Sequence, residues 1–136
     1  METDIYINLP IKDLNKTMAF FSELGFSFNQ MFTNEKAACM ILNEKANVML
    51  LHESFFKTFI KKEISDAHKT TEVLLAIMLK TRDEVNRFVD KAISMNAVEA
   101  REPQDFGYMY SRAFSDLDGH IWEVGYMDME NFPKKN

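Results

Sequence analysis

The first residues of the chain follow two simple patterns. Apolar and polar residues alternate over residues 4–9, which predicts a half-buried strand whose pairing Pro10 ends on one side. Apolar residues then recur at helical spacing over residues 14–24, between a capping residue at Asp13 and a stop at Gly25. A strand followed by an amphipathic helix is therefore expected.

Three more strands and a short helix are expected in the first half. Strand-like runs separated by turn residues cover residues 26–32, 37–42 and 47–52. Phenylalanines at helical spacing predict a short helix or turn over residues 55–60. Residues 61–70 are charged and polar, which makes them the best candidate for a linker.

The same order of patterns recurs in the second half. An apolar strand is expected over residues 71–79, and a capping box from Thr81 to Glu84 opens an amphipathic helix that Asn96 can end. The other expected elements are strands at 97–101, 108–115 and 120–127, a loop at 102–107, a tight turn at 116–119 and a frayed tail at 128–136.

Each half thus follows the order strand, helix and three strands. This repeat predicts a single α+β domain over residues 1–136, built from one module at 1–62 and another at 70–128. Each module alone leaves one face of its sheet uncovered. Two modules brought together can bury these faces around a shared cleft.

Composition and charge narrow the classes of function. The chain is 46% apolar and 27% charged, as in ordinary globular proteins, and its net charge of −5 argues against a nucleic-acid partner. Twelve Phe and ten Met predict either a soft core or an apolar ligand cavity. Cys39 lies in an apolar run, which favours a buried thiol. We expect a cytoplasmic protein with no membrane partner, since no stretch resembles a leader or a membrane span.

Three segments resemble the vicinal oxygen chelate superfamily, which includes glyoxalase I, bleomycin-resistance proteins and extradiol dioxygenases. The opening strand and helix of that family are similar to residues 8–14 (NLPIKDL) and 18–21 (MAFF). Its closing hairpin and strand are similar to residues 114–124 (FSDLDGHIWEV). Residues 101–112 (REPQDFGYMYSR) resemble the uncharacterised, glyoxalase-like members.

This resemblance implies a fold and a place for a site. Two βαβββ modules would form an open, incomplete β-barrel around a cleft, usually as a homodimer. Members with metal chemistry hold one divalent ion on His or Glu side chains of the first and last strands of each half. Those positions fall here on Tyr6, Leu50, Leu74 and Glu123. Only Glu123 is a usual ligand, so a divalent metal is disfavoured, and neither a metal ligand nor a cofactor is assigned.

Glu123 is the candidate catalytic residue, as a general base or as a hydrogen-bonding partner of a ligand. Alternation places it on the strand face opposite Trp122, pointing into the expected cleft. The competing interpretation is a structural carboxylate paired with Arg112 or Tyr110.

Other polar and aromatic residues are candidates to line the cleft. Tyr6 and Asn8 share a strand face, as do Tyr110 and Arg112, although cross-strand hydrogen bonding would explain them equally well. The full set of candidate ligand-binding residues is Tyr6, Asn8, His52, Tyr110, Arg112, Phe106 and Tyr108. Among these, Phe106 and Tyr108 are placed in a loop that could act as a lid, and His52 could equally be structural.

Three hypotheses about function follow. The first is a metal-independent protein that binds a small, partly apolar molecule in the cleft, as bleomycin-resistance proteins do. The second is a lyase, isomerase or dioxygenase of the glyoxalase type with an altered metal site. The third is a module that binds a partner protein, which a cleft filled by Phe and Met side chains would favour.

Overall fold

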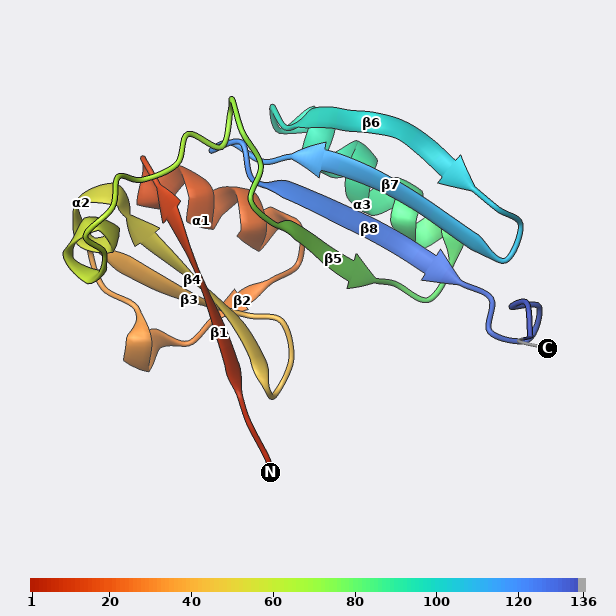
Figure 1. Ribbon diagram of the computed structural model, residues 1–136, viewed down its shortest axis with the longest axis horizontal. Coiled ribbons are helices and arrows are strands. Elements are labelled where there is room, and N and C mark those ends of the chain that lie inside the picture. Colours follow the sequence, from red (N-terminus) through yellow and green to blue (C-terminus); the bar gives the residue numbers. More distant parts are fainter. Residues whose placement is uncertain (135–136) are drawn as a thin grey trace. The chain divides into compact units, whose positions relative to one another are not determined.

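The computed structural model of the protein describes residues 1–134. The chain divides into two compact units, the first from Met1 to Ser65 and the second from Asp66 onward, and the boundary falls within the polar segment 61–70. Each unit is a βαβββ module with one four-stranded sheet, in agreement with the predicted α+β fold (Figure 1). Within residues 1–134, no helix combines the length and the apolar character needed to cross a membrane.

The first unit has the sheet order β1-β4-β3-β2, with β1 parallel to β4 and the other pairs antiparallel. Its elements are β1 (Ile5–Ile11), α1 (Leu14–Glu23), β2 (Ser27–Phe28), η1 (Gln30–Phe32), β3 (Ala37–Ile41), β4 (Ala46–His52), α2 (Glu53–Phe56) and η2 (Lys57–Phe59). The expected cap and stop of α1 are confirmed. The Asp13 carboxylate accepts a hydrogen bond from the Lys16 amide, and Gly25 has a positive φ of 106°.

One prediction for the first unit agrees with the structure and another is wrong. The strand β1 continues past Pro10 to Ile11, but it is an edge strand paired with β4 on one side, as expected where a proline ends the pairing on the other. Residues 26–32 do not form one long strand. The Asn29 side chain accepts a hydrogen bond from the Met31 amide and starts the 3₁₀ turn η1 there, which leaves β2 with two residues.

The second unit has the sheet order β5-β8-β7-β6, with β5 parallel to β8. Its elements are β5 (Leu74–Met78), α3 (Arg82–Ser94), β6 (Val98–Asp105), β7 (Met109–Ser115) and β8 (Ile121–Met127). The predicted start of α3 is confirmed, since the Thr81 hydroxyl accepts a hydrogen bond from the Glu84 amide. The Glu84 carboxylate reaches back to the amide of Lys80, and Asn96 ends the helix region with a positive φ of 78°.

Two further predictions fail in the second unit. The segment 102–107 is not all loop, because β6 extends to Asp105. Pro103 is tolerated there because β6 is an edge strand whose register shifts against β7 between Arg101 and Gln104. The tail is not frayed as far as it is described, since the Asp128 amide donates to the Tyr108 carbonyl at 2.8 Å.

The register of β7 against β8 gives this sheet two distinct faces. Tyr110, Arg112 and Phe114 point to one side with Trp122 and Val124, and we call this side the helix face, since α3 lies against it (Figure 1). The other side carries Ser111, Ala113, Glu123 and Gly125, and no helix within residues 66–134 covers it, so we call it the open face.

The turn between β7 and β8 sets this register. The buried carboxylate of Asp116 accepts hydrogen bonds from the amides of Asp118 and His120, and from the indole N–H of Trp122 at 2.9 Å. Burial raises the pKa of Asp116, although a nearby His120 charge and these hydrogen bonds oppose the shift. Gly119 has a positive φ of 89°, and a Cβ there would lie 2.8 Å from the backbone of Ala67, so only glycine fits the turn.

Candidate functional site

Glu123 lies in the middle of β8 on the open face, and its ion-pair partner is Arg101 of β6. The Arg101 Nη2 lies 3.0 Å from Glu123 Oε2 and also donates to the Ser111 hydroxyl. The Arg101 Nη1 donates to the Glu102 carbonyl at 3.1 Å. Both side chains of the ion pair are partly buried, with 26% of Arg101 and 29% of Glu123 exposed. The pair is therefore held in place but reachable from solvent.

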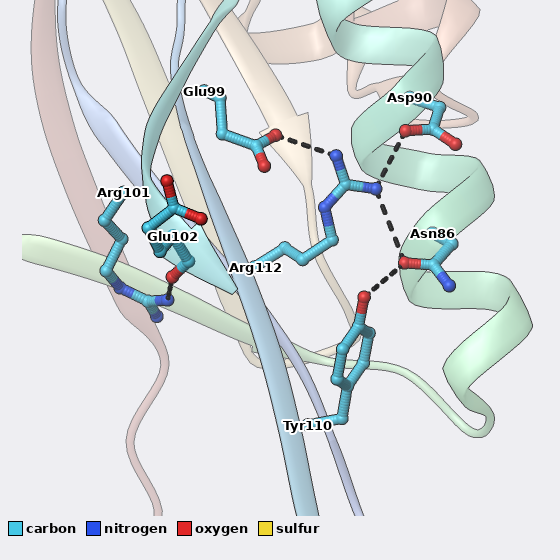
Figure 2. Close-up of polar contacts among 7 residues, drawn as sticks. All are labelled: Asn86, Asp90, Glu99, Arg101, Glu102, Tyr110 and Arg112. Carbon is cyan, nitrogen blue, oxygen red and sulfur yellow. Dashed lines mark hydrogen bonds and ion pairs between the residues drawn. The ribbon is translucent and has the colours of Figure 1, made fainter. Parts of the chain in front are cut away.

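The partner of Glu123 differs from the one that the sequence suggested. We expected Arg112 or Tyr110, but these residues point to the opposite side of the sheet. Arg101 reaches Glu123 because the register of β6 shifts between Glu99 and Arg101. Glu99 therefore pairs with Arg112 on the helix face, whereas Arg101 lies on the open face (Figure 2). Residues two apart normally share a face, so the sequence alone gave no signal for Arg101.

The remainder of the open face around this ion pair is largely apolar. Ala76 is the β5 residue in register with Glu123, and Ala113 is its β7 partner. Leu74 and Met78, also on this side of β5, are 55% and 50% exposed. The Met78 side chain covers Gly125, where an added Cβ would lie 3.1 Å from its terminal methyl. The open face thus combines exposed apolar side chains with one polar centre, the Arg101–Glu123 ion pair.

The helix face holds a hydrogen-bonded network that leaves little for a ligand to bind. Arg112 donates to Asp90 of α3 at 2.8 Å and to Glu99 at 2.7 Å, and the Tyr110 hydroxyl donates to Asn86 at 2.6 Å (Figure 2). Burial alone would lower the pKa of Arg112, but hydrogen bonds to the two carboxylates outweigh it and raise the pKa. Tyr110 and Arg112 therefore join β7 to α3, and the expectation that they share a face with Glu123 is wrong.

The candidate lid residues lie at the hairpin between β6 and β7. The ring of Phe106 stacks on Tyr108 with centroids 6.3 Å apart, and Phe132 from the tail contacts Tyr108 edge-on at 4.9 Å. Arg82 holds this hairpin through two hydrogen bonds of 2.7 Å to Asp105. Hydrogen bonds from Arg82 and from the Gly107 amide lower the pKa of Asp105 to about 2. Phe106 is 57% exposed, and its role in ligand binding stays a prediction.

Sequence reasoning missed the residues that hold this hairpin. Arg82 also lies with its guanidinium carbon 4.9 Å from the centre of the Tyr110 ring. A basic residue at the first position of a helix gives no indication of such a contact, because its partners are 23 and more residues away along the chain. Phe132 was missed because the tail was expected to fray.

The candidate residues of the first unit do not form one cluster. Tyr6 and Asn8 are exposed on one side of β1, whereas Leu50 is fully buried on the other side, in register with Leu9. Tyr6 and Leu50 therefore cannot contribute to one site, contrary to the expectation from the resemblance. His52 serves as the N-cap of α2, with its Nδ1 accepting from the Ser54 amide at 3.2 Å.

The residues present do not fit a divalent metal of the kind that the resemblance implies. Glu123 gives one oxygen to Arg101, and its neighbours in register are Ala76 and Ala113, which have no donor atoms. Neither unit, over residues 1–134, brings together three His, Cys, Asp or Glu side chains that could hold an ion. A site with a single carboxylate, already paired with a guanidinium, lacks the donor set that such ions need.

Comparison with known proteins identifies both a family and a fold. Residues 5–124 match the model of the Glyoxalase/Bleomycin resistance protein/Dioxygenase superfamily. A hypothetical protein from S. aureus is 25% identical, with 93% of this chain and 94% of that chain covered and a TM-score of 0.79. A comparison with curated protein sequences gave no match.

Two more distant structures share the fold. A glyoxalase/bleomycin resistance protein/dioxygenase family enzyme from Burkholderia phytofirmans PsJN is 16% identical, with 90% of this chain and 96% of that chain covered and a TM-score of 0.74. The fosfomycin resistance protein FosX from Listeria monocytogenes is 18% identical, with 96% and 97% covered and a TM-score of 0.68. At these sequence identities the two structures establish a shared fold. The chemistry of each protein depends on the residues of its own site.

Proposed function

This chain belongs to the glyoxalase/bleomycin resistance protein/dioxygenase superfamily, and we propose that it binds a small, partly apolar molecule on the open face of its second sheet, without a bound metal. The observation that carries this proposal is the ion pair of Arg101 and Glu123. It is partly buried on a surface that also carries the exposed apolar side chains of Leu74 and Met78. Such a surface offers contact area for an apolar body and one point at which a polar group can be oriented.

A binding function requires no further chemical group from the protein. Of the two Glu123 oxygens, only Oε2 is used by Arg101 in the described part of the chain, so Oε1 can accept a hydrogen bond from a ligand. Arg101 uses three of its five N–H groups in the contacts with Glu102, Ser111 and Glu123. The ion pair can therefore both accept from and donate to a bound molecule while it stays intact.

The binding proposal is tested with the neutral, apolar fluorophore N-phenylnaphthylamine (NPN). We expect its fluorescence to rise on binding, and Leu74→Gln to weaken this binding by about tenfold because a polar amide replaces apolar contact area. Met31→Gln is the matched control, since Met31 is an exposed apolar residue of the first unit. The absence of NPN binding, or equal losses in both variants, would contradict the proposal. Because the fold is similar to that of FosX, fosfomycin is the first compound to test for displacement of NPN.

The alternative function is a lyase, isomerase or dioxygenase of the glyoxalase type with an altered metal site. It would require metal ligands other than those that surround Glu123. Elemental analysis of the purified protein and of Glu123→Gln separates the two functions. Stoichiometric zinc, nickel, manganese or iron that is lost in the variant, together with turnover of the methylglyoxal hemithioacetal, would overturn the metal-free proposal. We also expect a homodimer, which light scattering after size-exclusion chromatography would test.

A further inference from the structure

We propose that Arg101 is the residue that recognises the polar group of the ligand, and that this group is an anionic or carbonyl oxygen. This inference rests on the proposed function and names the ligand class for the same site. Arg101 is the side chain of the open face that combines a permanent positive charge with unused N–H donors. The guanidinium would thus supply the positive charge at Glu123 without any metal ion.

The geometry holds the Arg101 guanidinium in a fixed orientation. The guanidinium donates to three acceptors. These are the Glu102 carbonyl of its own strand β6, the Ser111 hydroxyl of β7 and the Glu123 carboxylate of β8. A long side chain that is already ordered loses little conformational freedom when it binds a further acceptor. Glu123 therefore acts as a positioning residue for Arg101.

The same ion pair also limits how strongly an anion can bind. At 3.0 Å from Arg101, the negative charge of the Glu123 carboxylate opposes the attraction of an anion to the guanidinium. Replacing the carboxylate with the isosteric amide keeps an oxygen acceptor for Arg101 but removes the opposing charge. The proposal thus gives opposite signs for the two members of the pair: loss of Arg101 weakens anion binding, and loss of the Glu123 charge strengthens it.

The test compares anilinonaphthalene sulfonate (ANS), which is anionic, with NPN, which is neutral and similar in shape. We expect Arg101→Gln to weaken ANS binding by about tenfold, the effect of removing a charged hydrogen-bond donor at a partly exposed site. NPN binding should change by less than about twofold, since the apolar contacts remain. Glu123→Gln should strengthen ANS binding by about threefold or more, because an opposing charge is removed.

The control is Arg87→Gln, which makes the same change of charge on the exposed side of α3. Arg87 has no hydrogen bond or ion pair within the described residues, so its loss should leave both affinities unchanged. Circular dichroism and the melting temperature of each variant establish folding. If Arg101→Gln misfolds, Arg101→Lys and Glu123→Gln decide the question, with the lysine variant expected to retain part of the ANS affinity.

Two results would overturn the role of Arg101. One is an equal loss of ANS and NPN affinity in Arg101→Gln, and the other is a loss of ANS affinity in Glu123→Gln. Failure of the proposed function is distinct, because in that case neither probe would shift the amide resonances of Ser111 and Glu123 in the wild-type protein. A third result would contradict the inference but support the proposed function. In that case both probes bind at the open face, and replacing Arg101 does not change the preference between them.

Discussion

The two faces of the second sheet each hold an arginine paired with carboxylates, yet the two arginines have different surroundings. Arg112 on the helix face is 11% exposed and bridges β6, β7 and α3. Arg101 on the open face is 26% exposed and contacts only strand residues. A charged network enclosed by a helix therefore contributes to folding, whereas a similar pair on an uncovered face remains available for a ligand.

The largest effect should come from breaking the helix-face network. Arg112→Gln should lower the free energy of unfolding by about 3 kcal/mol, because a guanidinium that is only 11% exposed loses its charge-assisted hydrogen bonds to Glu99 and Asp90. The matched change Arg101→Gln should cost less than about 1 kcal/mol, as for a partly exposed pair. Urea denaturation of both variants measures the difference, and equal losses of stability would remove the distinction between the two faces.

The next effect concerns the turn that keeps the two faces apart. Asp116→Asn should destabilise the protein by about 2 kcal/mol. The carboxylate now accepts hydrogen bonds from the indole N–H and from two backbone N–H groups, and the amide NH₂ of asparagine would place a donor against one of these donors. Asp4→Asn serves as the control, since Asp4 is exposed and has no hydrogen bond or ion pair within the described residues. Thermal unfolding provides the measurement, and a change of less than about 0.5 kcal/mol would show that Trp122 and the turn do not depend on Asp116.

A smaller effect tests whether the helix face takes part in binding. Tyr110→Phe removes the hydroxyl that donates to Asn86 at 2.6 Å and should cost about 1 kcal/mol of stability. The affinity for ANS and NPN should not change, since the ring and its side of the sheet stay as they are. If Tyr110→Phe loses affinity for the probes while its stability is unchanged, Tyr110 contributes to ligand binding.

The smallest effect is a pH dependence at the β6–β7 hairpin. The pKa of Asp105 is about 2 in the folded protein, below the ordinary value of 3.8, because of its hydrogen bonds to Arg82 and to the Gly107 amide. Its contribution to stability is therefore present above about pH 4 and is lost as the pH falls through about 2. Asp105→Asn should show a flatter decline of stability over this window in urea titrations. An identical decline in both proteins would contradict the assigned pKa.

Much of the fold could be predicted because its signals are local. The Asp13 and Thr81 caps, the stop at Gly25 and the turn at Asp116 each depend on residues within a few positions, and all lie where the sequence indicated. The alternation in β8 correctly put Glu123 on the face away from Trp122. One error came where the edge strand β6 tolerated a proline, at Pro103.

For the candidate site, the sequence predicted the position of Glu123 but not its ion-pair partner. The position of Glu123 on the uncovered face of a sheet could be predicted from the sequence, because side-chain direction in a strand follows from its own residues. The partner of Glu123 could not be predicted, because it depends on the register shift in β6 that sends Glu99 to one face and Arg101 to the other. Such a shift depends on how one strand pairs with the next, and that pairing is a property of the assembled sheet and of no single segment.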